Sequence, residues 1–122
     1  MKLRGRVSNL HAVLPVTMRL QGQPDISLDF GVDTGFDGAL SLPTAAVVAM
    51  KLPFLEVIRV SLANEMDVMV SVHVATILWQ GVEKHVRVLA SGKRPKLGTA
   101  LLANYYLGID FVEDGSMMVE PL

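Results

Sequence analysis

The chain has no cysteine, no long apolar run and little net charge. The absence of cysteine among 122 residues excludes disulfides, zinc–thiolate sites and thiol nucleophiles together. No stretch approaches the roughly 18 consecutive apolar residues of a membrane helix, so no membrane partner is expected. The formal charge is −1 and the pI is near 6.3, which gives no indication of a nucleic-acid partner.

The chain has three histidines, and its first residues do not resemble a signal peptide. His11, His73 and His85 lie in scattered strand-like runs without an acid or histidine at ligand spacing, so we expect no metal site and no cofactor. Residues 1–6 are basic, but the polar pair Ser8-Asn9 follows them where a signal peptide would have an apolar core. The expected location is therefore cytoplasmic.

Apolar residues are abundant. They make up 51% of the chain, and the mean hydropathy is +0.42, which is high for one domain of this length. A single domain over residues 1–122 is large enough for a real core. The excess of apolar residues indicates many buried strands or a surface that a second subunit covers.

Alternation with a period of two dominates the sequence and predicts an all-β, mainly antiparallel domain. Pro15 is expected to mark an edge or bulge in the first strand, and a hairpin tip is expected near Asn64. Short helices are predicted over 43–50 and 98–104. The predicted strands cover residues 7–20 (one long strand or a bent pair), 25–32, 55–62, 66–78, 82–90, 109–112 and 116–119.

The tripeptide Asp33-Thr34-Gly35 occurs once, directly after the apolar strand 25–32. This places a carboxylate on a tight loop at the end of a buried strand. A glycine lets the backbone approach the carboxylate, and its N–H can donate to it. A simple turn without chemistry is the alternative, because the tripeptide would occur by accident in roughly one chain of this length in fifty.

A single such carboxylate predicts an assembly. Two aspartates about 3 Å apart share one proton, so that one can activate water while the other polarises a peptide carbonyl. Asp29 lies roughly 13 Å from Asp33 along an extended strand and is not expected to be its partner. The second carboxylate must then come from another copy of the chain, which predicts a homodimer.

Further elements accompany the tripeptide in a characteristic order. Leu97-Gly98 and a short helix follow it after some sixty residues, and a hairpin over 61–70 lies between. In this order the chain resembles the retropepsin-like aspartic proteases, the retroviral-type family with one Asp-Thr-Gly per subunit. The resemblance implies a closed acid-protease-type β-barrel with one or two short helices and one lobe per chain.

The resemblance also assigns roles at the tripeptide and at the second motif. It implies that Asp33 is catalytic, that Thr34 bonds to the partner loop and that Gly35 contacts the substrate backbone. Leu97 and Gly98 match the structural second motif, although Lys96 departs from its usual apolar first position.

Other implied substrate-binding positions differ from the retroviral pattern. Phe36 replaces a small residue, and Asp37 stands where an acid binds the substrate main chain. The arginine that pairs with that acid is replaced by Thr99. Asn64 and Glu65 form a polar flap tip without glycine.

Two functions follow as expectations. The first is an aspartic endopeptidase that cleaves a peptide or protein substrate. The alternative is an inactive dimer of the same fold that binds peptides or a partner protein. The departures from the retroviral pattern favour this alternative.

Minor features have ordinary structural interpretations. Met66, Met69, Met117 and Met118 are expected to fill the core rather than bind peptides, and 93–96 is expected to be a solvated basic loop. The chain ends, near 1–8 and 114–122, are expected to add dimer contacts because the strand 116–119 needs a partner.

Overall fold

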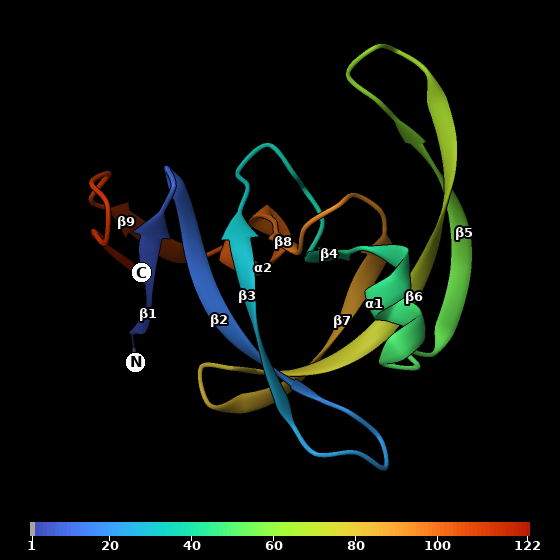
Figure 1. Cartoon of the computed structure of the whole chain (residues 1–122), viewed down its shortest axis with the longest axis horizontal. Coiled ribbons are helices and arrows are strands. Elements are labelled where there is room, and N and C mark those ends of the chain that lie inside the picture. Colours follow the sequence, from blue (N-terminus) through green and yellow to red (C-terminus); the bar gives the residue numbers. More distant parts are fainter. Residues whose placement is uncertain (1) are drawn as a thin grey trace.

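The computed structural model describes residues 2–122, which form one mixed β-sheet and two short helices. The strand order is β5-β6-β7-β4-β8-β3-β2-β1-β10-β9 (Figure 1). The elements are β1 (Leu3–Ser8), β2 (His11–Arg19), β3 (Ile26–Val32), β4 (Leu40–Leu42), α1 (Thr44–Ala49), β5 (Phe54–Ser61), β6 (Asp67–Trp79), β7 (Val82–Ala90), β8 (Lys96–Leu97), α2 (Thr99–Leu102), β9 (Tyr105–Ile109) and β10 (Ser116–Pro121).

A second pairing of β2 curls the sheet into a partial ring. Besides β1 and β3, β2 pairs with β6, where Thr17–Arg19 lie opposite Thr76–Leu78. The inward-facing residues of these strands form the core, which confirms the predicted all-β fold class. The largest side chains buried in this core include Phe30, Leu14, Met18, Leu40, Leu42, Ile77, Leu97, Leu101 and Met117.

The first predicted strand is two strands. Residues 7–20 do not run straight on, because Asn9 and Leu10 adopt φ values of 50° and 65° and turn β1 into β2. Pro15 pairs with Asp29 of β3 on one side of β2. On the other side, β2 pairs with β1 up to Val13 and with β6 from Thr17, so Pro15 lies between the two partners and needs no N–H there.

Two hairpins follow, the first with its tip near Asn64 as predicted. A tip at 62–66 joins β5 and β6, and a turn at Gln80-Gly81 joins β6 and β7. Gln80 and Gly81 both have positive φ values. α1 and α2 correspond to the predicted helices. Their N-cap residues are Pro43 and Gly98, and neither cap makes a side-chain hydrogen bond.

The C-terminal region differs from the prediction. The strand expected over 109–112 lies earlier, as β9, because residues 110–115 fold into a tight turn. Gly115 is buried in that turn and donates to Val112 O, while Asp114 donates to Val7 O. β10 then pairs with both β1 and β9, so the expectation that it needs a partner from another chain is wrong.

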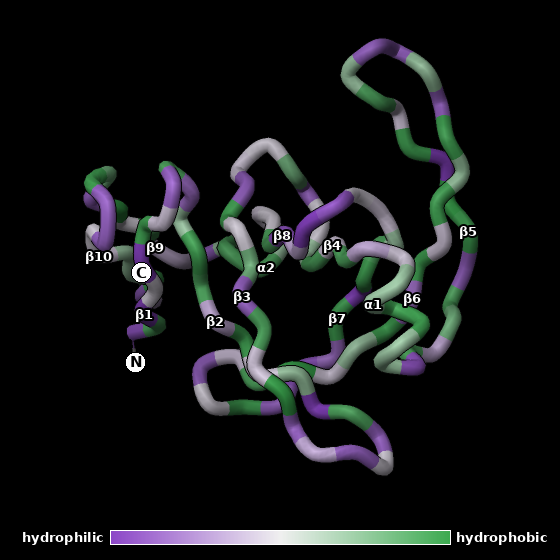
Figure 2. Tube along the Cα trace, viewed as in Figure 1, coloured by the Kyte–Doolittle hydropathy of each residue, from purple (hydrophilic) through white to green (hydrophobic). Residues whose placement is uncertain are grey.

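Two of the methionines expected in the core are on the surface. Met117 is buried, but Met66 and Met69 on the β5–β6 hairpin are 61% and 63% exposed. Figure 2 shows apolar residues along the arms of this hairpin and hydrophilic residues at its tip. Within residues 2–122, neither helix has the length and apolar content that crossing a bilayer requires.

Candidate active site

Asp33 follows β3 directly and is held at the head of a loop. Its N–H donates to Leu97 O at 2.9 Å, which continues the parallel pairing of β3 with β8. Its Oδ1 accepts the N–H of Gly35 at 2.9 Å, and its carbonyl accepts the N–H of Phe36 at 3.1 Å. The carboxylate is thereby fixed while 39% of the side chain stays exposed.

The second motif supports this loop from beneath. The N–H groups of Gly98, Thr99 and Ala100 donate to the carbonyls of Ala39 (2.9 Å), Phe36 (2.8 Å) and Gly38 (3.2 Å). Gly98 permits this approach, because a Cβ there would lie 2.5 Å from Phe36 O and 2.6 Å from the Phe36 ring. Leu97 is fully buried and anchors the motif in the core.

Three predicted site residues lie in the loop that follows Asp33, two of them exposed and one packed inward. Thr34 and Asp37 are exposed, and within residues 2–122 Asp37 forms no ion pair. The Phe36 ring packs inward, against Gly38 and Gly98. The Thr99 hydroxyl donates to Phe36 O at 3.3 Å, so it supports the loop backbone and does not contact the Asp37 side chain.

The predicted flap residues lie at the tip of the β5–β6 hairpin. Leu62 N–H donates to Met66 O (2.8 Å), Glu65 N–H donates to Leu62 O (2.9 Å), and Asn64 Oδ1 accepts the N–H of Met66 (3.2 Å). Glu65 takes a φ of 66°, so it occupies the left-handed position that a glycine would often fill. The hairpin projects on the same side of the molecule as the Asp33 loop (Figure 1).

Sequence reasoning missed Lys96. Its Nζ lies 3.6 Å from Asp33 Oδ2, and half of its side chain is exposed. The parallel register places Lys96 opposite Gly31, two residues before Asp33. Its position immediately before Leu97-Gly98 was the available signal, because the residue after that motif, Thr99, was matched to an arginine that pairs with the acid at position 37.

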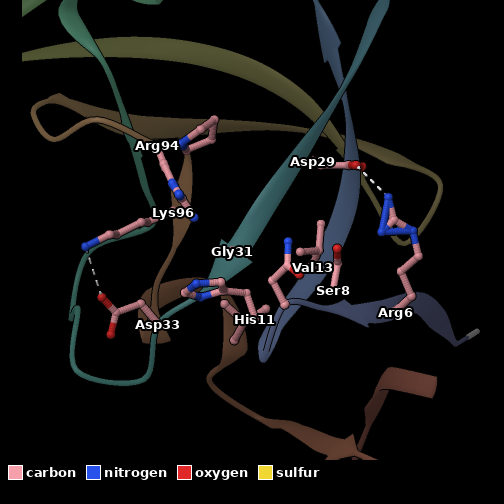
Figure 3. A pocket seen from close by; sticks show the side chains of 12 residues that line it. Arg6, Ser8, His11, Val13, Asp29, Gly31, Asp33, Arg94 and Lys96 are labelled. Carbon is pink, nitrogen blue, oxygen red and sulfur yellow. Dashed lines mark hydrogen bonds and ion pairs between the residues drawn. The ribbon is translucent and has the colours of Figure 1, made fainter. Parts of the chain in front are cut away.

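An open hollow of about 570 Å³ adjoins Asp33 (Figure 3). Asp29 is the other carboxylate that lines it, and Arg6 Nη2 pairs with Asp29 Oδ2 at 3.5 Å. In the described chain Asp33 makes no hydrogen bond with another carboxyl group. One chain therefore presents one fixed, solvent-accessible carboxylate, and the loop contains no second acid bonded to it.

Comparison with solved structures gives a match over nearly the whole chain. The crystal structure of a retropepsin-like aspartic protease from Rickettsia conorii superposes with a TM-score of 0.57 and 13% sequence identity. The match covers 99% of this chain and 90% of that one. No family model and no curated protein matches the sequence. The chain therefore has the fold of a retropepsin-like aspartic protease.

Proposed function

We propose that the protein is a homodimeric aspartic endopeptidase. The observation that carries the proposal is the Asp33 loop. It presents an ordered and accessible carboxylate, held by Gly35 and Leu97, with no second carboxyl bonded to it in the described chain. Hydrolysis by carboxylates needs two such groups sharing a proton. A second copy related by a two-fold axis at this loop would supply the other.

The chemistry follows from such a pair. One Asp33 takes a proton from water as the water oxygen attacks the peptide carbonyl, and the other donates a proton to the carbonyl oxygen. In the collapse of the tetrahedral intermediate, the Asp33 that took the water proton donates it to the amide nitrogen, the other Asp33 takes a proton back from a hydroxyl group, and the C–N bond breaks. The Gly35 N–H on Oδ1 fixes the orientation of the carboxylate, and no covalent enzyme intermediate is needed.

Exposed apolar turns beside the loop support a dimer face. Leu10 is 76%, Phe111 60% and Val112 63% exposed. Leu10 lies in the β1–β2 turn and the other two lie in the 110–115 turn, and both turns lie on the side of the Asp33 loop in Figure 1. Asn9 N–H donates to Glu113 Oε2 at 3.0 Å and joins the two turns. Burial of these side chains against a second copy would stabilise the pair of loops.

The test is peptide cleavage by Asp33→Asn. We expect wild-type protein to cleave members of a diverse peptide library and the variant to cleave none, with an unchanged melting temperature. Asp25→Asn is the matched control, because Asp25 lies just before β3, at the end of the strand opposite to the Asp33 loop, where it pairs with Arg19. Equal cleavage by wild type and Asp33→Asn would refute the proposal.

A non-catalytic peptide-binding dimer is the second candidate. The Lys96 ammonium 3.6 Å from Asp33 Oδ2 favours it, because it already occupies a position beside the oxygen that the carboxylate of a second copy would have to approach. This candidate predicts that wild type and Asp33→Asn bind the same peptides with similar Kd and that neither cleaves them. Cleavage inhibited by a statine-containing peptide would exclude it.

A further inference from the structure

The hollow beside Asp33 is locally basic in a chain whose formal charge is −1. Its charged lining consists of three basic side chains, Arg6, Arg94 and Lys96, and two carboxylates, Asp29 and Asp33. Opposite charges within a few ångströms attract most strongly where solvent is partly excluded. The hollow therefore favours an anionic occupant.

The pairing inside the hollow leaves one cationic side chain, that of Arg94, without an acidic partner in residues 2–122. Arg6 is engaged with Asp29 at 3.5 Å, and Lys96 with Asp33 at 3.6 Å. Arg94 forms no ion pair within the described part of the chain, and its guanidinium has the planar fork that suits a carboxylate. Figure 3 shows Arg94 and Lys96 on neighbouring parts of one segment beside Asp33.

The hollow lies directly beside the carboxylate that would meet the scissile bond. Gly31, Val32 and Asp33 line it in sequence, and Lys96 lies opposite Gly31. Gly31 offers no side chain there, and a Cβ would have only Pro95 O nearby, at 3.7 Å, so the wall stays open. A peptide whose scissile carbonyl meets Asp33 would place a neighbouring side chain in this hollow.

We propose that this hollow is a subsite for an acidic side chain, glutamate or aspartate, next to the scissile bond. Lys96 and Arg94 are its specificity-determining residues. The inference rests on the proposed function. In the dimer, the two Asp33 carboxylates carry one negative charge between them, whereas the two Lys96 ammonium groups carry two positive charges. A substrate carboxylate compensates the remaining charge, and Arg94 supplies a second donor.

The test compares matched peptides that differ only in Glu, Gln or Leu at one position flanking the cleaved bond. We expect wild type to cleave the Glu peptide roughly fivefold to tenfold faster in kcat/KM than the Gln peptide at low salt. Because the lysine is half-exposed, 0.5 M NaCl should reduce this ratio. Arg94→Met and Lys96→Met should each bring the Glu/Gln ratio toward one.

Lys93→Met is the matched control, because Lys93 is an exposed neighbour in the same loop that does not line the hollow. It should keep the wild-type ratio. Arg94→Glu should prefer a peptide with Lys at the same position. Using the ratio within each variant removes any general effect of the Lys96 substitution on Asp33.

The outcomes separate this inference from the proposed function. If wild type cleaves peptides but treats Glu and Gln alike, or prefers Leu, the acidic subsite is refuted and the endopeptidase stands. If no peptide is cleaved, the endopeptidase is refuted. Equal Kd values of wild type for the Glu and Gln peptides would then also refute the subsite, whereas tighter Glu binding that Arg94→Met abolishes would support it.

Discussion

Gly98→Ala should both destabilise the protein and inactivate the site. The new methyl group would lie 2.5 Å from Phe36 O and 2.6 Å from the Phe36 ring, and it would also meet the Gly38 carbonyl. Two of these three neighbours are backbone oxygens, which cannot rotate away as a flexible side chain can. The loop must therefore move, and the hydrogen bonds from Thr99 and Ala100 to it must lengthen.

The magnitude follows from the cost of overpacking. Adding a group to a tightly packed site costs up to about 3 kcal/mol, which for a chain of this size lowers Tm by about 12 °C. Urea unfolding should show a lower midpoint with an unchanged m-value. A displacement of the Asp33 loop by about 1 Å should reduce kcat roughly 100-fold, beyond what partial unfolding explains.

The control for this prediction is Gly31→Ala, judged by stability alone. Its Cβ would meet only Pro95 O at 3.7 Å, so Tm should change by less than about 4 °C. A Gly98→Ala protein with the wild-type Tm and kcat would refute the close-approach argument. Equal destabilisation by the two variants would refute the claim that the Phe36–Gly38 carbonyls are the cause.

Three further predictions test the core, the dimer and the loop. In urea unfolding of the monomer, at protein concentrations below the dimer Kd, Phe30→Ala should lower stability by about 4 kcal/mol because the ring is fully buried. Phe111→Ala, at 60% exposure in one chain, should change it by less than about 0.5 kcal/mol under the same conditions. Phe111→Asp should shift sedimentation from dimer to monomer and reduce activity at low protein concentration without changing the monomer's Tm; an unchanged dimer would place the interface elsewhere. Thr34→Val should raise the dimer Kd and leave monomer stability unchanged, and a loss of monomer stability would contradict the role assigned to the hydroxyl.

Local patterns predicted most of the fold. The alternation through Ile26–Val32 identified β3 because every second side chain faces the core, and Phe30 is fully buried. The two hairpins were predictable because their arms are long and β-branched. Asp33 was placed correctly at the end of β3 because a buried strand that ends in a tripeptide of small and polar residues must turn there.

The errors have tertiary causes. The break at Asn9-Leu10 carries no glycine, so the sequence left open whether residues 7–20 form one long strand or a bent pair and did not locate the turn. Residues 109–112 look β-like, but the close packing of Gly115 makes the chain turn there. Met66 is exposed because the β5–β6 hairpin extends beyond the rest of the sheet. The periodicity of the sequence does not reveal how far a hairpin extends.

The site was only partly predictable for a related reason. Asp33 and Leu97-Gly98 carry recognisable motifs, whereas Lys96 and Arg94 do not. Their proximity to Asp33 arises from the parallel pairing of β3 with β8, a contact between residues about sixty positions apart. Parallel pairing leaves no turn signal in the sequence, since its strands are joined by long connections.

The position of β10 between β1 and β9 bears on how activity would be controlled. β1 and β10 both find their strand partners within one subunit, so this part of the sheet can form before the subunit meets a second copy. Folding would then be a separate equilibrium from the proposed pairing of two Asp33 loops. Well below the dimer Kd, the rate of hydrolysis would rise with the square of the protein concentration, and a modest change in expression would act as a switch.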